Sequence, residues 1–159
     1  MKQLFLAVMM LGAANLSYAA ESVWDKPTQA LDNTVEAVVY RSPSCGCCGK
    51  WLTHLEKHGF KVIDHITGDV EKVKAELGVG QSLASCHTAI INGYVLEGHV
   101  PADDIKRLLL DKPKIKGLTV PGMVAGSPGM EMGERKMPFD VLAFDKQGKT
   151  TVYHQYKAY

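Results

Sequence analysis

The segment that most constrains this chain is a turn-rich stretch that carries three of its four cysteines. It covers residues 42–49 and reads Ser-Pro-Ser-Cys-Gly-Cys-Cys-Gly. The residues before it, 35–41, are rich in β-formers, and the residues after it, 47–58, place Trp51 and Leu55 on one helical face. The pattern therefore predicts a strand, a cysteine-bearing loop and a helix in immediate succession.

The following elements alternate in type and end at turn-forming residues such as Gly59 and Gly78. Asn92-Gly93 is a strong signal for a type I′ hairpin turn. Strands are expected at 60–66, 88–91 and 94–97, and helices at 69–77 and from Pro101 to the residue before Pro113. The order β-α-β-α-β-β-α predicts an α/β fold, a thioredoxin-like unit over residues 35–112. An unrelated α+β sandwich is the alternative.

Residues 113–138 differ in character, because they hold four prolines and five glycines. This composition excludes regular structure over most of the stretch. Two strands are expected after it, at 140–144 and 149–156, around a turn at residues 146–148. Segment 113–159 is therefore predicted to be a Met-bearing loop and a C-terminal β-hairpin extension, packed on the same domain.

The N-terminus has the pattern of a secretory signal peptide over residues 1–19. Lys2 supplies the positive charge, residues 4–11 are an unbroken apolar run, and Ser17-Tyr18-Ala19 provides small residues for cleavage. This run is short for an uncleaved membrane anchor, which is the alternative. Since no other segment is apolar enough to cross a membrane, we expect no membrane span after cleavage. The mature chain would begin with an N-terminal extension, 20–34, and would be periplasmic in a Gram-negative cell.

Composition narrows the classes of function. The 159 residues carry 18 basic and 17 acidic side chains, and this balance argues against a nucleic-acid binder. Four cysteines are too few for a disulfide-dense scaffold. Function is therefore expected from one local site.

That site is expected where the cysteines meet. In a thioredoxin-like fold, the loop entering the third strand lies beside the loop that starts the first helix. Here that entrance reads Ser85-Cys86-His87-Thr88, without the proline that many such folds carry there. Cys86 should therefore face Cys45, Cys47 and Cys48.

Three interpretations of the cysteines remain open. The first is a redox pair of Cys45 and Cys48, activated by the helix N-terminus, although Cys47 would then offer a competing disulfide. The second is a set of two structural disulfides, for which three cysteines on one tight loop have poor geometry. The third is a thiolate metal site, which is the interpretation we favour. Thiolates select Cu(I), zinc or iron–sulfur centres, and a Cys-x-Cys-Cys run lacks the two spaced pairs usual for zinc.

Charge balance bears on the number of metal ions. Four thiolates carry four negative charges, so one Cu(I) would leave three of them in a partly dry pocket, which is costly. Several bridged Cu(I) ions would approach neutrality. A multicopper cluster is therefore a hypothesis that charge balance favours.

Methionines and histidines extend the candidate ligand set. The mature chain has four methionines, all in the Pro/Gly-rich loop: Met123, Met130, Met132 and Met137. Thioether sulfur is a soft copper ligand, and simple packing over the site is the alternative role. His87 is the best histidine candidate. His54 and His58 are four residues apart on the first predicted helix, a spacing that can chelate metal, but a half-solvated boundary position is the interpretation we favour. His99 lies two residues before Pro101 and is expected only to help start a helix.

Four stretches together resemble the CopG-type periplasmic copper-resistance proteins, which are distinct from the ribbon-helix-helix repressors of the same name. The stretches are residues 44–51, 85–88, 97–101 and 120–131, and the similar residues 137–141 add to them. The resemblance implies a thioredoxin-like fold and a copper site made by Cys45, Cys47, Cys48 and Cys86. It also implies a role in copper tolerance, with a redox step between Cu(I) and Cu(II) as one form of that role.

The expected function is thus an exported copper-binding protein that sequesters or handles Cu(I). Its metal ligands would be the four cysteines, with His87, Met123, Met130 and Met132 as further candidates. The alternative is an enzyme, a thiol-disulfide or copper oxidoreductase that uses the Cys45/Cys48 pair. Partners would be copper ions and periplasmic copper-export or copper-oxidising proteins.

Overall fold

The structure is a computed structural model that describes residues 22–26 and 30–159. The predicted signal peptide, residues 1–19, lies outside the described residues. Within the described part of the chain, no helix is long and apolar enough to cross a membrane.

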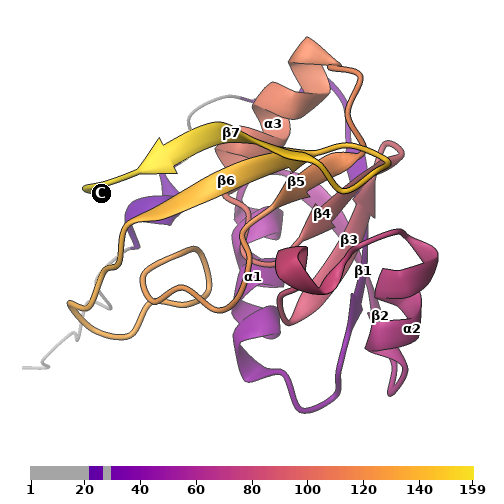
Figure 1. The fold of residues 1–159 in the computed structure, drawn as a ribbon. Helices are drawn as coiled ribbons and strands as arrows, with labels where there is room; N and C mark the ends of the chain where they lie inside the picture. The colour runs from indigo at the N-terminus through magenta and orange to yellow at the C-terminus, as the bar shows by residue number, and fades with distance from the viewer. Residues whose placement is uncertain (1–21, 27–29) are drawn as a thin grey trace, which may run out of the picture.

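The described elements form a mixed α/β fold, as predicted (Figure 1). Three helices accompany one seven-stranded sheet, whose strands follow the order β2-β1-β3-β4-β5-β6-β7. In chain order the elements are the 3₁₀ turn η1 Val23–Asp25, β1 Val35–Arg41, α1 Gly46–Lys57, β2 Phe60–Ile66, α2 Val70–Glu76, η2 Gln81–Leu83, β3 His87–Ile91, β4 Tyr94–Glu97, α3 Ala102–Asp111, β5 Gly117–Thr119, β6 Phe139–Phe144 and β7 Thr150–Tyr156.

The pairing of the strands agrees with the turns that the sequence predicts. β1 pairs in parallel with β2 and antiparallel with β3, and β3 and β4 form an antiparallel hairpin. Asn92 and Gly93 connect β3 to β4 with positive φ at both residues, 48° and 82°, as a type I′ turn requires. The predicted order of elements is observed from β1 through α3.

The stretch 113–138 contains one strand that the sequence pattern did not predict. This strand, β5, pairs in parallel with β4 and antiparallel with β6, so it joins the C-terminal hairpin to the main sheet. At Gly117 a Cβ would lie only 1.7 Å from the carbonyl oxygen of Val95, so this close pairing requires glycine. The hairpin β6–β7 therefore extends the same sheet (Figure 1).

Apolar side chains cover both faces of the sheet. The larger core packs Trp51 and Leu55 of α1 and Ile105 of α3 against the sheet, and it includes Leu96 of β4. The smaller core includes the neighbouring Val95 with residues of the α2–η2 region. Because successive strand residues point to opposite faces, the two cores lie on opposite sides of the sheet.

The N-terminal segment packs at the end of the C-terminal hairpin. The Trp24 ring lies 5.2 Å from that of Tyr156 and 4.9 Å from that of Tyr159, measured between centroids. Its Nε1–H donates to the carbonyl oxygen of Gly126, at 2.8 Å. The segment before β1 thus contacts the Met-bearing loop near its middle, at Gly126.

Candidate metal centre

The loop between β1 and α1 presents three cysteines at the helix N-terminus. Cys45 precedes the first helical residue, and its side chain makes no capping hydrogen bond. Cys47 is half-buried, and Cys48 is fully buried. The three cysteines therefore gather at the N-terminal end of α1, the end of a helix that favours negative charge.

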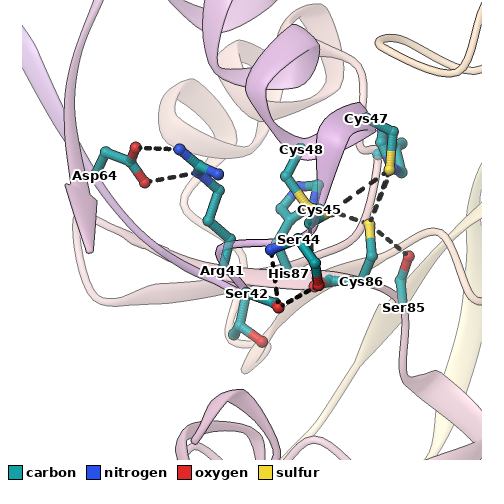
Figure 2. The surroundings of a disulfide bond; sticks show 12 residues. Arg41, Ser42, Ser44, Cys45, Cys47, Cys48, Asp64, Ser85, Cys86 and His87 are labelled. Carbon is teal, nitrogen blue, oxygen red and sulfur yellow. Dashed lines mark hydrogen bonds and ion pairs between the residues drawn. A yellow bond between two sulfur atoms is a disulfide. The ribbon is translucent and has the colours of Figure 1, made fainter. Parts of the chain in front are cut away.

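The loop entering β3 supplies the fourth cysteine, as predicted. The Sγ atoms of Cys47 and Cys86 lie 3.8 Å apart, although 39 positions separate the two residues. All four Sγ atoms lie within 4.8 Å of one another. Figure 2 shows Cys86 pointing from the β3 entrance toward the helix N-terminus, where the other three gather. The cluster has the residue types and spacing to hold a metal ion.

The sulfurs are not all free thiols. Cys45 and Cys48 form a disulfide with a Cα–Cα distance of 5.4 Å, while Cys47 and Cys86 are free. This arrangement differs from the set of two structural disulfides considered from the sequence. The bonded pair is the Cys-x-x-Cys pair that the redox interpretation named.

Two buried histidines adjoin Cys86. Nδ1 of His87 lies 3.2 Å from the Cys86 Sγ, and Nε2 of His99 lies 3.1 Å from it. Both rings are fully buried, and they meet edge to face with centroids 4.9 Å apart. Cys86, His87 and His99 form a second group whose ligand atoms lie within 4.8 Å of one another.

The expectation that His99 only helps to start a helix was therefore wrong. The Gly98 turn after β4 brings His99 back over Cys86, and His99 Nδ1 bonds the carbonyl oxygen of Pro128, at 2.7 Å. This bond also ties the ring to the Met-bearing loop. The stretch 97–101, one of those that carry the family resemblance, was the available signal for it.

Burial governs protonation at this centre. Burial, followed by the neighbouring Cys47 thiol, raises the pKa of Cys86 to about 12. Burial also lowers the pKa of both His87 and His99. At neutral pH the metal-free centre therefore holds a protonated Cys86 thiol between two neutral imidazoles.

A cavity of about 650 Å³ opens beside the cysteines, and cysteine and methionine side chains line it together with Lys50 and Glu131. Its walls include Cys45, Cys47 and Cys86 from one side and the Met-bearing loop from the other. From that loop come Met123, Met130 and Met132. Met130 is buried, whereas the other two are 58% and 62% exposed. All three predicted methionine candidates thus line the cavity, and Met137 is not among its lining residues.

The Met-bearing loop reaches the site through a close backbone contact. Gly129 has a φ of +81°, and a Cβ there would lie 2.7 Å from the Trp51 nitrogen and 3.1 Å from the Cys47 carbonyl oxygen. Glycine at this position lets the loop lie directly on the first turn of α1. Met130 follows immediately and is held against the cavity.

His54 and His58 are buried, so the expectation of a half-solvated boundary was wrong. Each is only 4% exposed. The start of α3 covers them, since the Ala102 N–H donates to His54 Nε2 at 3.0 Å and Lys106 Nζ lies 3.3 Å from His58 Nδ1. Neither belongs to the groups whose ligand atoms meet near the cysteines.

Two solved structures are similar to this chain in sequence and in fold. The one named "Copper resistance protein copG- Form 2" is 44% identical, with a TM-score of 0.75 and coverage of 78% of this chain and 99% of that chain. The one named "Copper resistance protein copG- Form 1" has the same identity and TM-score, with coverage of 79% and 100%. The family described as "Protein of unknown function, DUF411" matches residues 83–130. No curated protein matches this chain.

Proposed function

This chain belongs to the family of CopG copper resistance proteins, and we propose that it binds Cu(I) through Cys45, Cys47, Cys48 and Cys86 as part of copper resistance. The observation that carries the proposal is the convergence of four cysteine sulfurs within 4.8 Å of one another. Thiolates are soft ligands that prefer Cu(I) over hard cations.

We propose that the loaded site is a multicopper cluster. Four thiolates around one Cu(I) would leave three negative charges at a site where Cys48 is fully buried. Isolated buried charge is costly, and each further Cu(I) that thiolates bridge removes one unit of it. Charge balance therefore favours several ions per chain.

Binding by all four thiolates first requires reduction of the Cys45–Cys48 disulfide. An external dithiol would supply two electrons and two protons in this step. The donor becomes a disulfide, and Cys45 and Cys48 become thiols. Metal binding then displaces the thiol protons, including that of Cys86, so copper affinity rises with pH.

His87, Met123, Met130 and Met132 complete the proposed ligand set. The His87 ring is held beside the Cys86 sulfur, and the three methionines line the cavity at different depths. The exposed Met123 and Met132 lie where an arriving ion first meets sulfur, and the buried Met130 lies further in. Thioethers remain neutral at any pH, so they add ligands without adding charge.

We place this activity in the periplasm, after export by the predicted signal peptide. The partners that fit a Cu(I) carrier there are copper-export or copper-oxidising proteins. The names of the two similar structures, which refer to copper resistance, support a role with copper.

Copper titration of the reduced chain 20–159 tests the proposal. The protein is reduced anaerobically with a phosphine and titrated with Cu(I) against a chromophoric chelator. We expect more than one copper per chain, and sulfur-dominated X-ray absorption with a short copper–copper distance. Saturation at one ion would refute the cluster, and preference for zinc would refute the copper assignment. Met132→Leu should weaken binding, with Met137→Leu as the matched exposed control.

A thiol-disulfide or copper oxidoreductase is the second candidate, and the Cys45–Cys48 disulfide favours it. Cys47→Ser separates the two functions. Dithiol exchange needs only Cys45 and Cys48, so the variant should retain reductase activity. A thiolate cluster should lose copper in the same variant, and full copper retention would reject the four-cysteine site.

A further inference from the structure

A buried ion pair lies directly behind the cysteine centre, outside the proposed ligand set. Lys74 of α2 and Glu97 of β4 meet with Nζ and Oε1 2.6 Å apart, and their side chains are 3% and 0% exposed. Thr88 on the neighbouring strand β3 is also fully buried and donates to Glu97 Oε2, at 2.5 Å. Thr88 and Glu97 are direct partners in the strand register.

The same carboxylate also holds the backbone next to Cys86. Glu97 Oε1 accepts a 2.6 Å hydrogen bond from the backbone N–H of Ser85. This N–H belongs to the residue immediately before Cys86. A displacement of the Glu97 carboxylate would therefore also displace the Cys86 sulfur.

Other contacts also hold this entrance loop, since the Ser85 hydroxyl donates to the Gly122 carbonyl oxygen and the Cys48 Sγ lies 3.9 Å from the Cys86 carbonyl oxygen. The N–H of Gly122 donates to the Ala84 carbonyl oxygen at 2.9 Å, and the N–H of Gly98 donates to the His87 carbonyl oxygen at 3.0 Å. There is no cis peptide bond among the described residues, and this loop contains no proline to restrict its backbone. Between Ala84 and His87, the Glu97 carboxylate holds the backbone from the sheet side by accepting from the Ser85 N–H.

A buried ion pair is a poor source of stability, because the cost of removing both charges from water offsets their attraction. Apolar residues of similar volume in place of the pair would often stabilise the fold equally well or better. The chain nevertheless buries the pair and uses both carboxylate oxygens. An anchoring role for the carboxylate accounts for this arrangement.

We propose that Glu97, neutralised by Lys74, is a positioning residue that fixes the Ser85–Cys86 backbone and so sets Cys86 against Cys47. This inference rests on the proposed copper-binding function, which it deepens by naming what holds the fourth ligand in place. Mutation of a residue that orients a metal ligand through a hydrogen bond typically weakens metal binding roughly 10- to 100-fold.

Two double variants separate anchoring from stability. Lys74→Met/Glu97→Gln and Lys74→Met/Glu97→Leu both remove the buried charges, but only the glutamine keeps an oxygen that accepts from Ser85. Glu97→Asp is a third variant, in which the charge stays and the carboxylate withdraws by about 1.5 Å. Each is measured for thermal unfolding, for Cu(I) affinity, and for hydrogen exchange of the 84–88 backbone without metal.

We expect the leucine variant to bind Cu(I) roughly 10- to 100-fold more weakly than the glutamine variant, and its 84–88 backbone to exchange faster. Equal affinity and equal exchange in the two would overturn the proposal. If the leucine variant does not fold, Glu97→Asp decides by the same two measurements, and wild-type values there would overturn it. The exchange comparison uses no metal, so failure of wild-type copper binding would reject the proposed function separately.

Discussion

Gly129→Ala tests whether the Met-bearing loop holds the candidate metal centre closed. The structure defines two separate costs of the added methyl group. The backbone there has a φ of +81°, which costs an L-residue about 1–2 kcal/mol. In addition, a Cβ at 2.7 Å from the Trp51 nitrogen falls 0.7 Å short of the 3.4 Å at which ordinary contact begins. Such overpacking typically costs about 1–3 kcal/mol.

Gly133→Ala is the matched control, because it separates the two costs. Gly133 lies in the same loop with a φ of +64°, and a Cβ there would meet no atom within 4 Å. We therefore expect the control to lose only the backbone cost, and Gly129→Ala to lose about 1–3 kcal/mol more in urea unfolding.

Copper release provides the functional measurement. The added methyl group pushes residues 129–130 away from α1, so the buried Met130 leaves the cavity wall. Cu(I) transfer to a competing chelator should then be faster for Gly129→Ala than for Gly133→Ala. If the two variants match in both unfolding free energy and copper release, the close contact between loop and helix has no role at the site.

Three further measurements follow from burial. Burial lowers the pKa of His54 to about 3, so the folded state stays neutral while the unfolded chain binds a proton below its ordinary pKa of 6.5. The contribution of His54 to the free energy of unfolding should be complete above pH 6.5 and fall by up to roughly 4–5 kcal/mol by pH 3. Urea unfolding at several pH values measures this loss, and the variant His54→Gln should not show it. The alkylation rate of Cys86 should continue to rise about tenfold per pH unit beyond pH 9, because the pKa of its thiol is about 12. Peptide mass spectrometry measures this rate, and a plateau near pH 9 would contradict the expectation. Met130→Ala should cost about 2–3 kcal/mol in unfolding, whereas the exposed Met137→Ala should stay within about 0.5 kcal/mol.

The sequence predicted the strands whose ends are marked by neighbouring turn-forming residues. β2 and β4 have the predicted bounds, 60–66 and 94–97, because turn formers flank each strand. β5 was missed, since three residues that begin with glycine carry no periodicity. This strand exists because β4 and β6 pair with it on either side.

The histidines also show that local sequence does not reveal which distant element covers a residue. His54 and His58 flank the apolar stripe of α1, which by itself indicates a boundary position. The N-terminus of α3 buries them, and about 45 residues of chain separate the two helices in sequence. His99 reaches Cys86 only because the turn at Gly98 reverses the chain there.

By itself, the sequence determined that four cysteines belong to one centre, and that its methionines come from one Pro/Gly-rich loop. Element order and the loop positions of the cysteines are sufficient for that inference. Only the tertiary structure decided which sulfurs are bonded, that His99 adjoins Cys86, and that Glu97 anchors the fourth cysteine. These features depend on distances of a few ångströms between residues far apart in the chain, which arise only when the sheet assembles.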